Sequence, residues 1–510
     1  MTTEGNNRGL DVFTVVLGQA CEGGGKRWYT STLELQLASL ELCRACRSVP
    51  ILHVRVNDET PRSLWSKRVS GRVPVVRALG LTWELPMEVL LERAAVELWQ
   101  WSKSLQLRVS VAAGTLVSVA WPEGLEQLEL FELCGADVDQ SINGVVWPAF
   151  LKKLLLGNVF NQPVEGVVWP ASLQVLLFGE DFNQPIAGVV WPKSLHLLTF
   201  GSCFNNPIAG VVWPASLQQL SFGEKFNQSM IGVVWPAPLL QLEFGADFNQ
   251  PIQEVRWPDS LQELKFGFRF NQPLAEAVWP DSLQLLSFGR DFNRPIAGVV
   301  WPDSLQQLSF GKKFNQSMIG VVWPASLQRL SFGADFNQPI QGVRWPDSVQ
   351  ELKFGFHFNQ PIQGVRWPDS LQELKFGYWF NKPIVGVAWP AALQRLSFEA
   401  CFNQGIGEVV WPDSLQLLSF GLEFNRPIDD VVWPASLQHL SFGDFFNQPI
   451  DRVVWPDSLQ QLSFGYCFNQ PVDGVAWPPC MQKLEVGSCF NQYVNHIGWP
   501  TSLQFFQQKW

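Results

Sequence analysis

The dipeptide Trp-Pro recurs along most of this chain at a fixed interval of 22 residues. Between Trp147 and Trp499 it occurs seventeen times without an insertion or deletion, and an earlier copy stands at Trp121, offset by 26. Such constant spacing is typical of a solenoid, because each coil stacks only on its neighbours and an added residue would shift every column of side chains. We therefore predict that most of the 510 residues form one repetitive architecture.

The middle of each repeat alternates between apolar and polar residues. In one unit Leu220, Ser221 and Phe222 follow this order, and the position of Ser221 accepts Ser, Lys, Glu, Thr or Leu across the units. A period of two predicts a strand whose Leu and Phe point inward. A second alternation, Val233-x-Trp235, predicts either another short strand or an extended segment whose middle residue faces water.

Two glycines and one asparagine recur at fixed positions in the unit. The positions of Gly223 and Gly232 mark bends, where a side chain would obstruct the turn or a positive φ is required. Glu399 replaces the first glycine in one coil, and we expect a local distortion there. The asparagine after Phe is present in all sixteen units from Asn161 to Asn491. Inward asparagines stacked in register would form a ladder of hydrogen bonds between coils.

These residues resemble two related repeat patterns. The spacing Leu217-x-x-Leu220-x-Phe222 resembles a leucine-rich repeat with Phe in place of the last Leu. The residues from Pro324 to Ile340, read as Pro-Ala-Ser-Leu-Gln-Arg-Leu-Ser-Phe-Gly-Ala-Asp-Phe-Asn-Gln-Pro-Ile, resemble the FNIP repeat throughout. The resemblance covers roughly residues 121–510. It implies a leucine-rich-repeat-like solenoid and, by analogy, protein interaction.

We therefore predict a mainly β repeat solenoid whose coils carry one or two short, parallel, in-register strands. Residues 1–100 are predicted to be an N-terminal cap region with degenerate repeats, for example at Leu33–Leu37. The solenoid is predicted to span 101–510, beginning with a decayed unit at Trp101–Gln106 and becoming regular from 147. Residues from Leu85 to Glu92 are similar to the opening of an F-box, and an amphipathic capping helix over 87–99 is the alternative interpretation.

Charge and cysteine usage limit the partners and the compartment. Residues 121–510 hold 22 Lys and Arg against 35 Asp and Glu, which argues against binding to a phosphate backbone. No apolar stretch approaches the ~20 residues of a membrane span, and no signal peptide is recognisable. The nine cysteines have no fixed place in the repeat, and Cys43 and Cys46 have neither a second pair nor a histidine cluster nearby. We predict reduced thiols in an intracellular, cytoplasmic protein.

No set of residues predicts catalysis or cofactor binding. The five histidines occupy mostly unrelated repeat positions, and no phosphate-binding loop of the Gly-x-x-x-x-Gly-Lys-Ser type occurs. We expect no enzymatic activity, no cofactor and no metal. Asn227 and Asn315 begin glycosylation sequons, but fourteen other units keep the asparagine without the serine, so its role is predicted to be structural.

One group of side chains in the coils around Trp345 and Trp367 is the candidate surface for a partner. It combines exposed aromatic residues with charges, as binding hot spots do. The candidate residues are Arg344, Lys353, Phe356, His357, Arg366, Lys375, Tyr378 and Trp379. Ordinary drift of the repeat, with partial burial of these aromatics, is the alternative interpretation.

The predicted function is that of a non-enzymatic protein-interaction scaffold with a long repeat surface. Two alternatives remain open at the level of sequence. The F-box-like residues would suit a substrate-binding adaptor of a ubiquitin ligase, and the sequons would suit an extracellular recognition or adhesion protein. The partner and the oligomeric state do not follow from the sequence.

Overall fold

The computed structural model describes residues 142–508 without interruption and, before them, Trp121 and five strands. For the first four of these strands it describes the backbone alone. Several sequence predictions therefore lie outside the described residues. They are the F-box-like residues after Pro86, the alternative helix at 87–99, the alternation at 33–37, residues 101–104 of the decayed unit, and Cys43 and Cys46.

The chain divides into two compact units, Met1–Gln228 with Gly232–Leu239, and Ser229–Ile231 with Leu240–Trp510. The strands of the first unit are β1 (Phe13–Leu17), β2 (Leu52–Val56), β3 (Leu79–Pro86), β4 (Leu105–Ser110), β5 (Leu125–Phe131), β6 (Lys153–Leu155), β7 (Val175–Leu177), β8 (Leu197–Thr199) and β9 (Gln219–Ser221). Those of the second are β10 (Gln241–Glu243), β11 (Glu263–Lys265), β12 (Leu285–Ser287), β13 (Gln307–Ser309), β14 (Arg329–Ser331), β15 (Glu351–Lys353), β16 (Glu373–Lys375), β17 (Arg395–Ser397), β18 (Leu417–Ser419), β19 (His439–Ser441), β20 (Gln461–Ser463), β21 (Lys483–Val486) and β22 (Phe505–Gln508).

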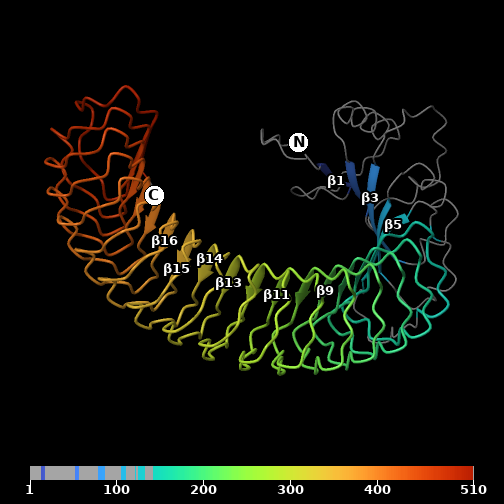
Figure 1. The fold of residues 1–510 in the computed structure, drawn as a ribbon. Coiled ribbons are helices and arrows are strands. Elements are labelled where there is room, and N and C mark those ends of the chain that lie inside the picture. The colour runs from blue at the N-terminus through green and yellow to red at the C-terminus, as the bar shows by residue number, and fades with distance from the viewer. Residues whose placement is uncertain are drawn as a thin grey trace, which may run out of the picture. The chain divides into compact units, whose positions relative to one another are not determined.

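Within each unit, every strand pairs in parallel with the next strand along the chain. The register advances by one repeat, so Leu308 of β13 lies opposite Leu330 of β14. A register shift between Leu105 and Gln106 interrupts the pairing of β4 with β5. In the second unit the strand arrows lie side by side along one edge of the stack (Figure 1). The predicted solenoid of parallel, in-register strands is confirmed, and the described residues contain no helix.

The core of each coil is a ring of apolar side chains. In β13, Leu308 is buried while Gln307 and Ser309 on either side are half-buried, which confirms the inward direction predicted from the alternation. The other buried positions bring the interior of this coil to seven side chains, none more than 6% exposed. They are Trp301, Leu305, Leu308, Phe310, Phe314, Met318 and Val321.

Aromatic rings of successive coils stack into columns inside the solenoid. Phe314 and Phe336 have ring centroids 6.2 Å apart and planes within 8° of parallel. Trp169 and Trp191 stack at 6.3 Å. The indole Nε1–H groups of these two tryptophans are buried and find no hydrogen-bond acceptor among the described residues. Packing of the rings, and not hydrogen bonding of the indole, therefore holds the tryptophan column together.

The segment before each tryptophan is extended but forms no strand in the described coils from 142 onward. Its middle residue faces water as predicted: Val322 is 78% exposed, while Val321 and Trp323 on either side are buried. Each described coil from 142 onward therefore carries one strand, the lower of the two numbers predicted, and Val-x-Trp forms no second strand there.

The two glycines of the repeat are needed for different reasons, as the sequence predicts. A Cβ atom added to Gly311 would lie 1.8 Å from the carbonyl oxygen of Gly289 in the preceding coil, so a side chain would force the coils apart. Gly320 instead has a φ of +81° and open space around it. Its turn needs a left-handed backbone, which glycine adopts without steric cost.

Residues that replace these glycines change the turn in different ways. The Phe314 N–H donates to the Gly311 carbonyl at 3.2 Å, and the coil with Glu399 at this position lacks the equivalent bond from Phe402 among the described residues. The distortion expected at Glu399 is thus confined to its turn, since β16, β17 and β18 keep their register. At the second glycine position, Glu276 adopts a φ of +69° and is the one non-glycine residue with positive φ in the described part of the chain.

The asparagines link successive coils through their side chains. The Asn315 N–H donates to Asn293 Oδ1 at 3.0 Å, and Asn315 Oδ1 in turn accepts from the Asn337 N–H at 3.0 Å. Gln338 adds a side-chain bond to the same Oδ1 at 3.1 Å. These asparagines are half-buried rather than inward, because the phenylalanine before each one fills the core.

Candidate partner-binding surface

Two surface columns run along the stack at the turn that follows each strand. We call the residue directly after the first glycine, or its replacement, the first turn column, and the next residue the second turn column. In the second unit the backbone holds both columns in register, because the N–H of each second-column residue donates to the carbonyl of the first-column residue one coil earlier. Lys313 bonds Arg290 in this way at 2.8 Å, and Trp379 bonds Phe356 at 2.9 Å.

Side chains of the second turn column touch their neighbours in adjacent coils. In the second unit, Arg269 pairs with Asp247 at 3.2 Å, and Lys313 pairs with Asp291 at 2.9 Å. His357 Nδ1 lies 3.1 Å from Asp335 Oδ1. Aspartates alternate with Arg, Lys or His along this part of the column, so the carboxylates of Asp247 and Asp291 each meet a cation in the next coil.

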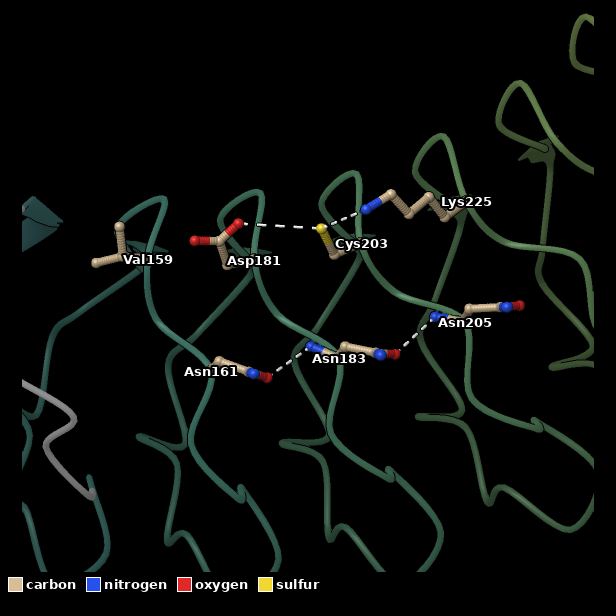
Figure 2. Close-up of a pocket in the computed structure, with 7 residues that line it drawn as sticks. All are labelled: Val159, Asn161, Asp181, Asn183, Cys203, Asn205 and Lys225. Atoms are coloured by element: carbon tan, nitrogen blue, oxygen red, sulfur yellow. Dashed lines mark hydrogen bonds between the residues drawn. The ribbon is translucent and has the colours of Figure 1, made fainter.

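The same column is visible in the first unit, where it borders a hollow that is open to solvent. Figure 2 shows Asp181, Cys203 and Lys225 in a row above the asparagines of the same coils. Cys203 Sγ lies 3.4 Å from Lys225 Nζ and 3.9 Å from Asp181 Oδ1. Neighbouring coils in both units therefore bring second-column side chains into contact.

Four aromatic residues of the predicted site gather where the charge alternation of the second turn column ends. The rings of Phe356 and Tyr378, both in the first turn column, stack with centroids 4.5 Å apart. Trp379 lies edge-on to both rings, at 6.3 Å from Phe356 and 5.4 Å from Tyr378. His357 contacts Phe356 at 5.0 Å. We call Phe356, His357, Tyr378 and Trp379 the aromatic cluster.

The aromatic cluster is accessible to solvent. Phe356 is 41% exposed and Trp379 is 48% exposed, and Tyr378 between them is half-buried. Their mutual stacking fixes the orientation of the rings in the absence of a partner. An apolar surface that is already ordered loses little side-chain entropy on binding.

The two predicted lysines lie on the strands just before the cluster. Glu351 pairs with Glu373 and Lys353 with Lys375 across β15 and β16, as the repeat spacing predicts. Lys353 contacts Glu351 on its own strand and lies 3.4 Å from Glu373 on the next. These contacts, above all the hydrogen bond to Glu351, raise the pKa of Lys353 despite its partial burial. The positive charge of Lys353, which lies beside that of Lys375, is thus balanced by Glu351 on its own strand and by Glu373 on the next.

The two predicted arginines belong to another part of the coil. Arg344 and Arg366 occupy the exposed position before the tryptophan, where most coils have valine. Neither forms a salt bridge with any residue that the structure describes. The predicted site therefore contains three groups: the aromatic cluster, the strand lysines Lys353 and Lys375, and these arginines, which no described contact joins to the other two.

The described part of the chain contains neither a cluster of metal-ligating side chains nor a membrane-spanning helix. No group of three or more His, Cys, Asp or Glu side chains in the described part of the chain is placed to hold a metal ion. Among the same residues, no helix is long and apolar enough to cross a membrane.

Comparison with known proteins gives a family match over just over half of the chain. The model described as FNIP Repeat matches residues 182–225, 226–269, 270–313, 314–357, 344–379, 358–399 and 424–467. The crystal structure of CroV588, described as a novel circular leucine-rich-repeat protein, is 34% identical with a TM-score of 0.70. The region of similarity covers 91% of this chain and 70% of the CroV588 chain.

Two other solved structures are much less similar. An internalin (inlF) from Listeria monocytogenes is 10% identical over 72% of this chain and 82% of its own, with a TM-score of 0.27. The pneumococcal vaccine antigen PcpA is 12% identical over 82% of this chain and 76% of its own, with a TM-score of 0.11. No curated protein sequence matches the chain.

Proposed function

Because the chain belongs to the FNIP repeat family, with coils like those of leucine-rich-repeat proteins, we propose that it is a non-enzymatic scaffold that binds a protein partner. Core positions are nearly the same in every coil, so they carry no information about a partner. The turn columns vary from coil to coil and face solvent, so they supply the specificity. The aromatic cluster is the point at which the partner docks.

One observation carries this proposal: the three large rings of Phe356, Tyr378 and Trp379 contact one another on the turn columns. Phe356 and Trp379 keep more than two fifths of their surface exposed, although aromatic side chains gain much by burial. Binding hot spots are enriched in tryptophan and tyrosine and are surrounded by residues that exclude water. The strand lysines and their glutamates lie in the same coils and would form such a surround.

We further propose that the protein acts inside the cell. The five cysteines of the described residues are all free thiols, and free thiols are the usual state in a reducing compartment. The acidic balance of residues 121–510 suits a protein partner with basic groups more than a nucleic acid.

Affinity purification from the native cell with quantitative mass spectrometry tests the proposal. The bait is the full chain, compared with a Tyr378→Ser/Trp379→Ser variant. A matched control, Leu422→Ser/Glu423→Ser, changes the same two columns two coils away. We expect a protein that the chain and the control variant recover equally and that the cluster variant loses.

Two results would contradict the proposal. If every specifically recovered protein is retained by the cluster variant, the aromatic cluster is not the docking point. If the chain recovers no specific protein in cells that express it, the scaffold function itself is wrong. Circular dichroism of each bait confirms that a loss of binding does not result from unfolding.

A further inference from the structure

Two cysteines occupy the second turn column in successive coils of the second unit. Cys467 follows Gly465 by two residues, and Cys489 follows Gly487 by two residues. The register is fixed on both sides of this pair. The Cys489 N–H donates to the Tyr466 carbonyl at 3.2 Å. One residue further, Phe468 and Phe490 stack with centroids 6.1 Å apart and planes within 3° of parallel.

The backbone separation at this position suits a disulfide. Neighbouring parallel strands lie about 4.8 Å apart, and a disulfide joins residues whose Cα atoms are about 4.4–6.8 Å apart. The two cysteines are directly opposite each other, since β20 and β21 pair Leu462 with Leu484, five residues before each one. The register and the spacing between coils therefore place the two cysteines within the range that a disulfide spans.

The side chains of this column point the same way in adjacent coils. The Lys313–Asp291 and His357–Asp335 contacts join the same positions elsewhere in the second unit. Cys401 Sγ also lies 3.7 Å from Glu423, its neighbour in the column. Cys489 is exposed and Cys467 is half-buried, so a small molecule can reach the pair. Burial, and next to it the Cys489 thiol, raises the pKa of Cys467.

We propose that Cys467 and Cys489 are a redox-active dithiol that small-molecule disulfides convert into a disulfide between two coils. The more exposed Cys489 loses its proton, and its thiolate attacks one sulfur of the small disulfide. A mixed disulfide forms at Cys489 and one small thiolate leaves, taking a proton from solvent. The Cys467 thiolate then attacks the Cys489 sulfur and releases the second small thiol. Two protein thiols are oxidised and one small disulfide is reduced to two thiols.

The bond would clamp one coil to the coil before it. In a solenoid each coil is held only by its neighbours, so a covalent link at this position restrains the opening of the coil that contains β21. The amide hydrogens of residues 484–509 would then exchange more slowly in the oxidised chain than in the reduced chain.

Peptide mapping after incubation in glutathione buffers tests the proposal on the full chain. Trypsin cleaves after Arg452, Lys483 and Lys509, which places Cys467 in peptide 453–483 and Cys489 in peptide 484–509. Cys480 shares the first peptide, so the experiment uses the Cys480→Ser variant. We expect the two peptides to become joined in a monomeric chain as the share of oxidised glutathione rises, and to separate again with dithiothreitol.

Single substitutions in the same background identify the bond. Cys467→Ser and Cys489→Ser should each abolish the joined peptide and leave a glutathione adduct on the remaining cysteine. The proposal is overturned if glutathione modifies both cysteines without joining them, or if the joined peptides come only from dimers. Equal hydrogen exchange of residues 484–509 in the oxidised and reduced chains would refute the clamp.

Discussion

The turn at the second glycine position requires a positive φ in most coils, so a residue other than glycine there can strain the backbone. Eleven described glycines adopt the left-handed backbone there or at equivalent turns, for example Gly320. Glu276 does so without the advantage of lacking a Cβ atom. Other coils avoid the strain, since Glu254 occupies the equivalent position without a positive φ. The repeat therefore tolerates a side chain at this position either by strain or by a different turn.

Replacing the strained residue should stabilise the chain. Glu276→Gly removes the left-handed strain, and we expect the free energy of unfolding to rise by about 1 kcal/mol. Glu254→Gly is the matched control and should lower stability slightly, because glycine gains conformational freedom in the unfolded chain. Urea denaturation followed by circular dichroism measures both. Equal effects of the two substitutions would show that φ at Glu276 carries no strain.

At the scale of the coil, much of the structure could be predicted from the sequence. The alternation at Leu220 and Phe222 predicts a strand because its period is two, and the constant spacing predicts the register. The second strand at Val-x-Trp could not be excluded, since exposed Val322 between two buried residues has the same alternation as a strand. A strand differs from an unpaired segment by its backbone hydrogen bonds to the next coil. The pattern of buried and exposed side chains is the same for both.

The candidate surface could be predicted only in part. Repeat spacing brings Phe356 and Tyr378 together, because both follow the first glycine of their coils. The alternating charges of the second turn column can be read from the sequence at every twenty-second residue, from Asp247 to His357. Arg344 comes from the same stretch of sequence as the aromatics, but it precedes the tryptophan and so lies on a different part of the coil from the turn after the strand.

The second turn column should contribute to stability through its charges. Lys313→Glu removes the nearer of the two cations beside Asp291 and puts a like charge in its place. We expect the free energy of unfolding to fall by about 0.5–1 kcal/mol at low salt. Lys312→Glu, in the first turn column, is the control, because Lys312 forms no salt bridge with a described residue. Chemical denaturation at low and at 1 M salt measures the effect, which should shrink as salt screens it. A loss that does not depend on salt would contradict an electrostatic cause.

At the scale of the whole molecule, stability should depend on complete coils. Deleting residues 301–322 removes one coil and leaves every column in register, so the chain should still fold. Deleting 301–311 removes half a coil, displaces the asparagine and phenylalanine columns, and should cause local unfolding on both sides. Circular dichroism and limited proteolysis distinguish the two. Similar behaviour of both deletions would show that the coils are not the units of stability.

The most direct test of the account is to measure partner affinity and stability on the same variant. Tyr378→Ala/Trp379→Ala should weaken binding of the captured partner roughly 30-fold, equivalent to about 2 kcal/mol, in isothermal titration. Its thermal unfolding should remain close to that of the unmodified chain, because both rings lie outside the core. Unchanged affinity combined with a lower unfolding temperature would contradict the account, since the rings would then serve packing between coils and not recognition.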